Sequence, residues 1–319
     1  MKKWIWLILI VFLVGCQTDA LEYYRDASLK TQTIEQGQSK LDMTLEVDFS
    51  DQVVKDNPEL EDFLGKIVYE QNAQFSGEDV IARQYLGNDA IGLDTIFYKS
   101  GQDEYLRIPF LGKYLSLAEY EDNELYAEPP FTKASEEEIK KMWLALVGEE
   151  DVVNLGDEVI DTPEGEVKVK KFVISFSNEQ VHQFFGDVLT LLEKDPKFVE
   201  MIPKYPSYVY QDDQMMTYEN NLSLDEMILG MRTFMDNVVV DEFKMTAYID
   251  IDKYIVHHVY DVKLSFKDFI EEALNEVRFH AEYQLYDLHE KQVLSFPDVG
   301  EEDYITSEEI IENFEAFMD

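Results

Sequence analysis

Residues 243–251, 254–266 and 277–285 read FKMTAYIDI, YIVHHVYDVKLSF and VRFHAEYQL. In each stretch apolar or aromatic side chains recur at every second position. Such a period of two predicts a strand with one buried face and one polar face. The stretches follow one another closely, so we expect neighbouring antiparallel strands. The buried faces would be formed by Phe243, Met245, Ala247, Ile249 and Ile251, by Tyr254, Val256, His258, Tyr260, Val262, Leu264 and Phe266, and by Val277, Phe279, Ala281, Tyr283 and Leu285.

The same alternation recurs toward the N-terminus. Residues 41–49 alternate cleanly, residues 67–117 resemble a strand meander, and strands at about 151–160 and 166–176 flank the turn at 161–165. We count about nine or ten strands and five or six helices. Because the strands come in runs joined by short turns, the fold class is α+β with a mostly antiparallel sheet.

Helix starts are marked by capping residues. Asn57-Pro58 predicts one start, and pairs of a hydroxyl residue with an acid or amide three positions later predict the others. These pairs are Ser135 with Glu138, Ser177 with Gln180, Ser223 with Glu226, and Thr306 with Glu309.

The N-terminus carries an export signal. Lys2 and Lys3 precede an apolar run over 4–14, which is too short for an ordinary membrane span and fits a signal peptide. Leu13-Val14-Gly15-Cys16 then resembles a bacterial lipobox. That resemblance implies cleavage between Gly15 and Cys16, a lipid on the Cys16 sulfur and palmitate-type acylation. The alternative is an uncleaved N-terminal anchor with a chance cysteine; both place the body outside the cytoplasmic membrane.

This gives a division of the chain. Residues 1–15 are a signal peptide, residues 16–38 form a lipid-anchored tether and weak helix, and residues 39–319 form one α+β domain. A weak internal repeat of a strand, a helix and an Asp-Pro element suggests two related halves, 39–150 and 151–319. No run after residue 16 approaches the length of a transmembrane helix.

The net charge and the cysteine count exclude several classes of partner and of structural site. The chain has 67 acidic and 27 basic residues, a net charge of -40 and one cysteine. Such a field repels phosphate, so nucleic acid is not expected as a partner. A single cysteine excludes an internal disulfide framework and a multi-cysteine metal site.

The layout resembles the LolA/LppX-like family of lipoproteins. The lipobox resembles that of bacterial lipoproteins, in particular Gram-positive ones. The resemblance lies in the lipobox, in the Leu-x-Met-x-Leu-x-Val pattern of 41–47, in 105–114 (YLRIPFLGKY), and in 281–286 with 293–297. It implies a curved, mostly antiparallel sheet, a partly open barrel, with helices packed on its concave face. It also implies a hollow that holds acyl chains or lipoproteins. This chain is longer and far more acidic than a single such domain.

No phosphate loop, nucleophile elbow or zinc helix occurs, so we expect no catalytic residues, no cofactor and no metal site. Three weaker patterns are kept as alternatives. His258 and His280 would approach each other if their strands pair, Asp250 and Asp252 would share a strand face, and the acidic runs 149–151 and 301–303 would bind calcium weakly. In each case solvated surface residues are the simpler interpretation.

Methionine gathers in one region, at Met215, Met216, Met227, Met231, Met235 and Met245. Methionine adapts to varied apolar shapes, so it suits a promiscuous apolar site, although ordinary core is commoner at helical spacing. If a ligand site exists, its lining would be Met227, Met231, Met235, Phe243, Met245 and Ile249.

The sequence therefore predicts a non-enzymatic lipoprotein, anchored to the cell membrane through Cys16 and facing the extracytoplasmic side. It would bind an apolar ligand, such as a lipid or acyl chain, or a partner protein. The alternative is a structural or interaction lipoprotein of the envelope whose core is filled. A hollow or filled space between sheet and helices distinguishes the two.

Overall fold

Three long strands lie side by side where the alternating pattern predicts them: β11 (Val238–Asp250), β12 (Ile255–Phe266) and β13 (Leu274–Tyr286). All of their pairings are antiparallel. The computed structural model describes residues 20–305, apart from 89, 102, 118–129, 202–206, 212–213, 219–222 and 268–272. The predicted signal peptide, Cys16 and the helix predicted from Thr306 lie outside the described residues.

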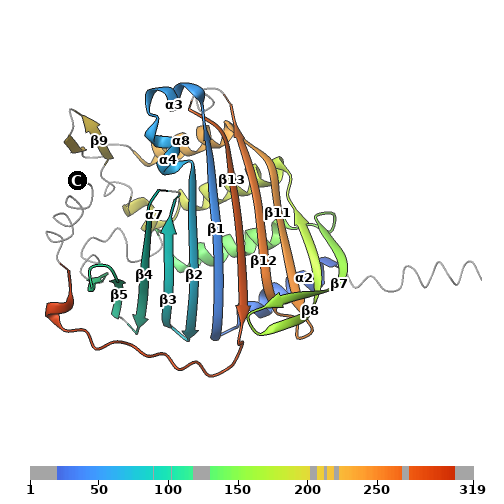
Figure 1. The fold of residues 1–319 in the computed structure, drawn as a ribbon. Coiled ribbons are helices and arrows are strands. Elements are labelled where there is room, and N and C mark those ends of the chain that lie inside the picture. Colours follow the sequence, from blue (N-terminus) through green and yellow to red (C-terminus); the bar gives the residue numbers. More distant parts are fainter. Residues whose placement is uncertain are drawn as a thin grey trace, which may run out of the picture.

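The three strands belong to one eleven-stranded antiparallel sheet (Figure 1), whose order is β6-β5-β4-β3-β2-β1-β13-β12-β11-β8-β7. The first half of the chain contributes β1 (Gln36–Phe49), β2 (Lys66–Ser76), β3 (Asp79–Gly87), β4 (Gly92–Ser100), β5 (Asp103–Ile108) and β6 (Lys113–Ser116). The second half adds β7 (Val152–Thr162) and β8 (Gly165–Ser175), and β9 (Ser207–Gln211) pairs separately with β10 (Gln214–Tyr218).

The sheet is open. Its edge strands are β6 and β7, so it does not close into a barrel, and within it the two halves of the chain meet where β1 pairs with β13. The α+β class with a mostly antiparallel sheet is confirmed. The partly open barrel is corrected to an open sheet, because β6 and β7 do not pair with each other.

The helices are α2 (Ala20–Thr31), α3 (Asp51–Asp56), α4 (Glu59–Leu64), α5 (Lys133–Leu146), α6 (Asn178–Leu192), α7 (Pro196–Met201) and α8 (Leu224–Asp236), with a short 3-10 turn at Glu301–Asp303. Helices α2, α6 and α8 pack against β7, β11 and β12. Trp143 of α5 contacts Phe243 of β11, with ring centroids 6.0 Å apart. We call the side of the sheet that these helices cover the helix face; Figure 1 looks onto the other side, the outer face.

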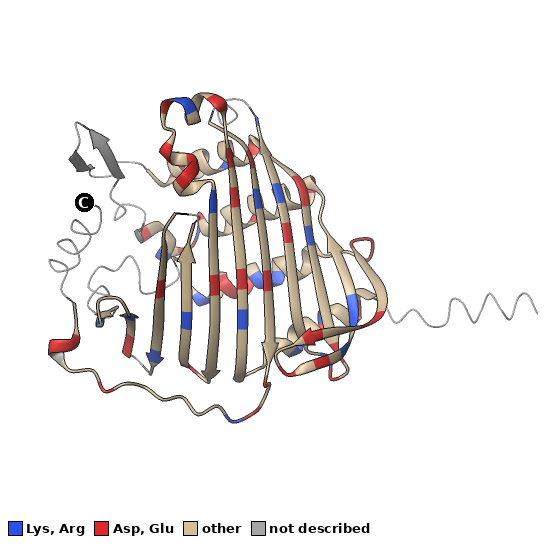
Figure 2. Ribbon diagram, in the orientation of Figure 1, with Lys and Arg blue, Asp and Glu red and all other residues tan. Residues whose placement is uncertain are grey.

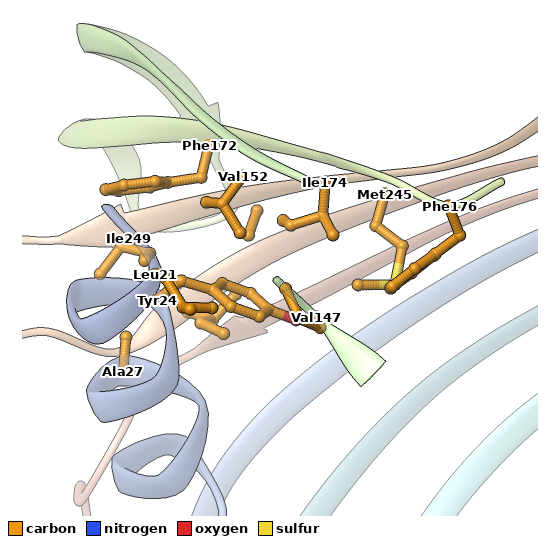
Figure 3. Close-up of a cluster of buried hydrophobic side chains, with 12 residues drawn as sticks. Leu21, Tyr24, Ala27, Val147, Val152, Phe172, Ile174, Phe176, Met245 and Ile249 are labelled. Atoms are coloured by element: carbon orange, nitrogen blue, oxygen red, sulfur yellow. The ribbon is translucent and has the colours of Figure 1, made fainter. Parts of the chain in front are cut away.

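The largest core cluster fills the space between α2, α5 and the strands β7, β8 and β11 (Figure 3). Helix α2 contributes Leu21, Tyr24 and Ala27, which lie on one face because they are three residues apart. Burial of these side chains fixes α2 on the sheet. Residues 36–38, expected in the tether, begin β1 instead.

Local signals at helix starts are confirmed in two cases and corrected in two. Ser177 and Ser223 each form a full capping box. Helix α5 instead begins after Thr132, whose side chain accepts a hydrogen bond from Ser135 N, so Ser135 lies within the first turn. Asn57 ends α3 rather than starting a helix, and Pro58 is the N-cap of α4.

Candidate binding surface

One row of side chains crosses nine strands of the helix face. Because the strands are paired in a fixed register, each member lies directly opposite the next. In order from β7 to β4 the row is Val152, Ile174, Met245, Tyr260, Ala281, Met43, Tyr69, Leu86 and Leu93.

Exposure changes along this row. Ile174 and Met245 are 0% and 1% exposed, under the helices. Met43 and Tyr69 are half-buried. At the far end, Leu86 is 50% exposed and Leu93 is 37% exposed. Along this row the helix face is therefore sealed over β7, β8 and β11 and opens at Leu86 and Leu93. Farther along the same face of β3 and β4, Ala82 and Thr95 are buried again.

The neighbouring row has the same character. It joins Phe243, Val262, Phe279, Leu45 and Ile67 across β11, β12, β13, β1 and β2. All five are only half-buried. We call the open part of the helix face the apolar floor, defined by Met43, Leu45, Ile67, Tyr69, Leu86 and Leu93.

A smaller exposed apolar rim adjoins the floor. Phe63 and Leu64 of α4 and Ile91 before β4 are all exposed. Asn88 Nδ2 donates to the Phe63 carbonyl at 2.9 Å, which fixes α4 against the β3–β4 turn. A pocket of ≈ 540 Å³ lies beside α4, with Val47, Phe63 and Lys66 in its lining.

The helix face also carries polar side chains, among them Gln71 and Gln84, which lie opposite each other two residues from Tyr69 and Leu86. Tyr69 donates to Gln71 Oε1 at 2.6 Å. His258 Nδ1 lies 3.3 Å from the Tyr260 hydroxyl, while its Nε2 is buried without a partner among the described residues. Burial, with a smaller contribution from His257, lowers the pKa of His258 to about 4, so the ring is neutral at pH 7. The helix face thus carries no charge at this position.

The structure does not bring the six predicted lining residues together. Met245 and Ile249 are fully buried in the main core, with Phe243 packed against it. Met227 and Met231 pack on a second cluster around Leu189, Phe198 and Ile228. Met235 packs on a third, around Val238 and Phe266. The floor was missed because its residues come from β1–β4, where the sequence shows only ordinary alternation.

The histidine pair is excluded by register. Strands β12 and β13 do pair, but His258 faces Tyr283 whereas His280 faces Asp261. Those positions are three apart, so the two rings lie on opposite faces of the sheet. The described residues contain no group of three or more His, Cys, Asp or Glu side chains suited to a metal ion.

The acidic patterns serve as turn caps. Asp250 ends β11 and accepts from Tyr254 N at 2.8 Å, while Asp252 lies beyond the strand in the turn. Asp151 accepts from Gly148 N at 2.7 Å, and Asp303 accepts from Gly300 N at 2.9 Å. These hydrogen bonds hold chain reversals in shape.

The outer face carries acidic and basic residues side by side, as the red and blue segments of Figure 2 show. One row reads Glu242, Lys263, Arg278, Glu46 and Lys66. Lys263 Nζ lies 2.6 Å from Glu276, and Asp261 lies 2.8 Å from His280 Nδ1. The hydrogen bond to Asp261 raises the pKa of His280. Over β11, β12, β13, β1 and β2 the two faces of the sheet therefore differ in chemistry, one ionic and one apolar, whereas over β4 and β5 the outer face carries the stacked rings of Tyr98 and Tyr105.

Comparison with known proteins adds little. No family model matches the chain, and no curated protein matches it. Among solved structures, it is similar to a DUF1329 family protein from Desulfovibrio piger, with 8% identity and a TM-score of 0.23, over 86% of this chain and 93% of that chain. It is also similar to a protein with a YmcC-like fold from Bacteroides fragilis, with 8% identity and a TM-score of 0.17, over 81% and 97% of the two chains. At these scores neither likeness bears on function.

Within the described residues, none of the helices is long and apolar enough to cross a bilayer.

Proposed function

We propose that the protein is a non-enzymatic, extracytoplasmic lipoprotein that binds an acyl chain or similar apolar ligand on the apolar floor. One observation carries this proposal: the cross-strand row that is sealed at Ile174 and Met245 opens to 50% exposure at Leu86. Burying such side chains stabilises a complex by roughly 25 cal/mol per Å² of apolar surface. An extended acyl chain lying along the row would cover several of them at once.

The Cys16 anchor and the LolA/LppX-like resemblance belong to the same proposal. The lipobox directly follows an apolar run of signal-peptide length. Lipidation at Cys16 would hold an acidic body on a membrane that its charge alone does not favour.

The anchor is tested by expressing the full chain with labelled palmitate. We expect label in the wild type and none in Cys16→Ser, which should leave the membrane fraction or keep its signal peptide. Equal labelling of the two proteins would refute lipidation at this residue.

The ligand is tested with protein lacking residues 1–15 and carrying Cys16→Ser. Native mass spectrometry should detect co-purified lipid, and a fluorescent fatty acid should bind. In the double variant Leu86→Glu/Leu93→Glu, two carboxylates at the open end should weaken binding at least about tenfold, which corresponds to 1.4 kcal/mol.

The matched control is Val159→Glu, because Val159 is also exposed but lies on the edge strand β7. It should bind like the wild type. Absence of lipid and of fatty-acid binding in the wild type would support the filled-core structural lipoprotein instead. Equal weakening of fatty-acid binding by Val159→Glu would show that binding does not depend on the apolar floor.

A further inference from the structure

The proposed anchor constrains which end of the molecule meets the membrane. Helix α2 begins at Ala20, four positions after Cys16. Four residues span at most about 14 Å even when fully extended. If Cys16 is lipidated, as proposed above, the start of α2 must stay within that distance of the bilayer surface.

The surface beside α2 exposes apolar side chains. Ile251, in the turn between β11 and β12, is 90% exposed, and Leu29 of α2 is 52% exposed. The turn is tied to the end of α2, since Ile255 N donates to Thr31 Oγ1 at 2.8 Å and Lys30 Nζ donates to the Asp252 carbonyl. Helix and turn therefore form one surface, which we call the anchor end: Tyr23, Leu29, Lys30, Ile251, Lys253 and Tyr254.

Lysine and tyrosine surround these apolar side chains. Lys253 Nζ lies 5.1 Å from the Tyr23 ring centre, and Lys30 Nζ lies 4.2 Å from that of Tyr254. Lys170 Nζ also approaches Tyr23, at 5.8 Å. Tyrosine favours the headgroup level of a bilayer, and lysine places its stem along apolar surface while its ammonium stays in water.

The charge of the anchor end differs from that of the whole chain. Helix α2 carries Glu22 and Asp26 against Arg25 and Lys30, so its side chains sum to zero. The turn adds Asp250 and Asp252 against Lys253, so helix and turn together carry -1, whereas the chain totals -40. Asp26 lies 3.4 Å from Lys253. The repulsion that the acidic body experiences from anionic lipid is thus small along α2 and this turn.

We propose that the anchor end docks on the phospholipid bilayer that holds Cys16, with Ile251 and Leu29 entering the headgroup region. The short tether, the exposed apolar pair and the low local charge all fit this occupant. A second copy of the chain covering the same surface would give a different outcome in the test below.

The test supplies the anchor chemically. Protein lacking residues 1–15 is coupled through Cys16, its single cysteine, to a maleimide lipid in phosphatidylglycerol/phosphatidylcholine vesicles with brominated acyl chains. A tryptophan is placed at the turn by the substitution Ile251→Trp. Bromine should quench this introduced tryptophan at least about twofold more than the one in the matched control, because only a residue at bilayer depth approaches the acyl chains.

The matched control is Leu229→Trp on α8, where Leu229 is 64% exposed. Helix α8 precedes β11 at the end opposite the turn, and β11 itself is about 40 Å long at 3.3 Å per residue. The signal of the native Trp143 is measured in the unsubstituted protein and subtracted, and unchanged circular dichroism shows that both variants fold.

Equal quenching in the two variants, or none in Ile251→Trp, would overturn the inference. Low quenching together with a doubled mass of the uncoupled protein in light scattering would assign the surface to a second copy instead. Because coupling does not use cellular lipidation, failure here is distinct from a failure of palmitate labelling at Cys16.

Discussion

At the scale of single residues, Asp195 connects two helices. It is 3% exposed, and its Oδ2 accepts hydrogen bonds from Thr132 N, Thr132 Oγ1 and Ser135 Oγ at 3.0, 2.6 and 2.5 Å. Its Oδ1 accepts from the main-chain N–H groups of Lys197 and Phe198, both at 3.0 Å. One carboxylate therefore joins the start of α5 to the start of α7. Burial opposes ionisation, but these hydrogen bonds outweigh it and lower the pKa of Asp195.

Replacing this carboxylate should be costly. Asp195→Asn turns an amide N–H₂ toward groups that donate, and should lower the free energy of unfolding by about 3 kcal/mol. Urea unfolding checks this through a lower midpoint with an unchanged slope. The control Asp187→Asn, on an exposed position of α6, should change stability by less than about 0.5 kcal/mol.

The same contact predicts a pH dependence. A pKa that is lower in the folded state gives stability that is present above the unfolded value, near 3.9, and lost as the pH falls below it. The gap in stability between wild type and Asp195→Asn should therefore narrow from pH 5 to pH 2.5. A constant gap would show that ionisation of Asp195 contributes nothing.

At the scale of elements, two glycines with open space around them should respond in opposite ways to alanine. Gly186 lies inside α6 and Gly77 lies in the β2–β3 turn, where its φ is +61°. Gly186→Ala should stabilise by roughly 0.5–1 kcal/mol through helix propensity. Gly77→Ala should destabilise by about 1 kcal/mol, because a Cβ is strained in the left-handed region.

Thermal unfolding of the two variants checks this pair. Since neither alanine would meet another atom within 4 Å, the opposite signs isolate the backbone contribution. Stabilisation by both substitutions would contradict the assigned turn at Gly77.

The strands and helix starts also show how much of the fold could be predicted from the sequence. Alternation predicted β11, β12 and β13, and local hydroxyl–amide or hydroxyl–acid spacing predicted the starts of α6 and α8. The start of α5 was placed at Ser135 rather than Thr132, because the Ser135 hydroxyl is used by Asp195, sixty residues away. The apolar floor could not be found, since it depends on which strands the helices leave uncovered.

At the scale of the whole molecule, the net charge of -40 opposes compactness. Exposed ion pairs such as Arg83–Asp94, at 2.6 Å, contribute little in water and cannot balance it. Salt shortens the screening length from about 10 Å at 0.1 M to about 3 Å at 1 M. Added salt should therefore weaken the long-range repulsion among the acidic residues more than it weakens the short-range attraction within the exposed ion pairs.

The melting temperature should therefore rise by several degrees between 0.1 M and 1 M NaCl. Differential scanning calorimetry of the protein without residues 1–15 checks this. A melting temperature that stays constant or falls would mean that the mixed charges of the outer face already neutralise the field.

The pairing of β1 with β13 has a consequence for how the chain is made. Met43 lies opposite Ala281, so β1, which is synthesised before the other strands of the sheet, pairs on one side with β13, which is synthesised after them. Contacts between such distant segments make folding slow, and an unpaired strand is prone to aggregate meanwhile. For a chain exported N-terminus first, β1 would emerge with an empty edge and remain so until nearly the entire polypeptide had followed. Strands β1 to β6 can pair as they appear, but the pairing of β1 with β13 that completes this sheet is a late event, and a chaperone would matter most in the period before it.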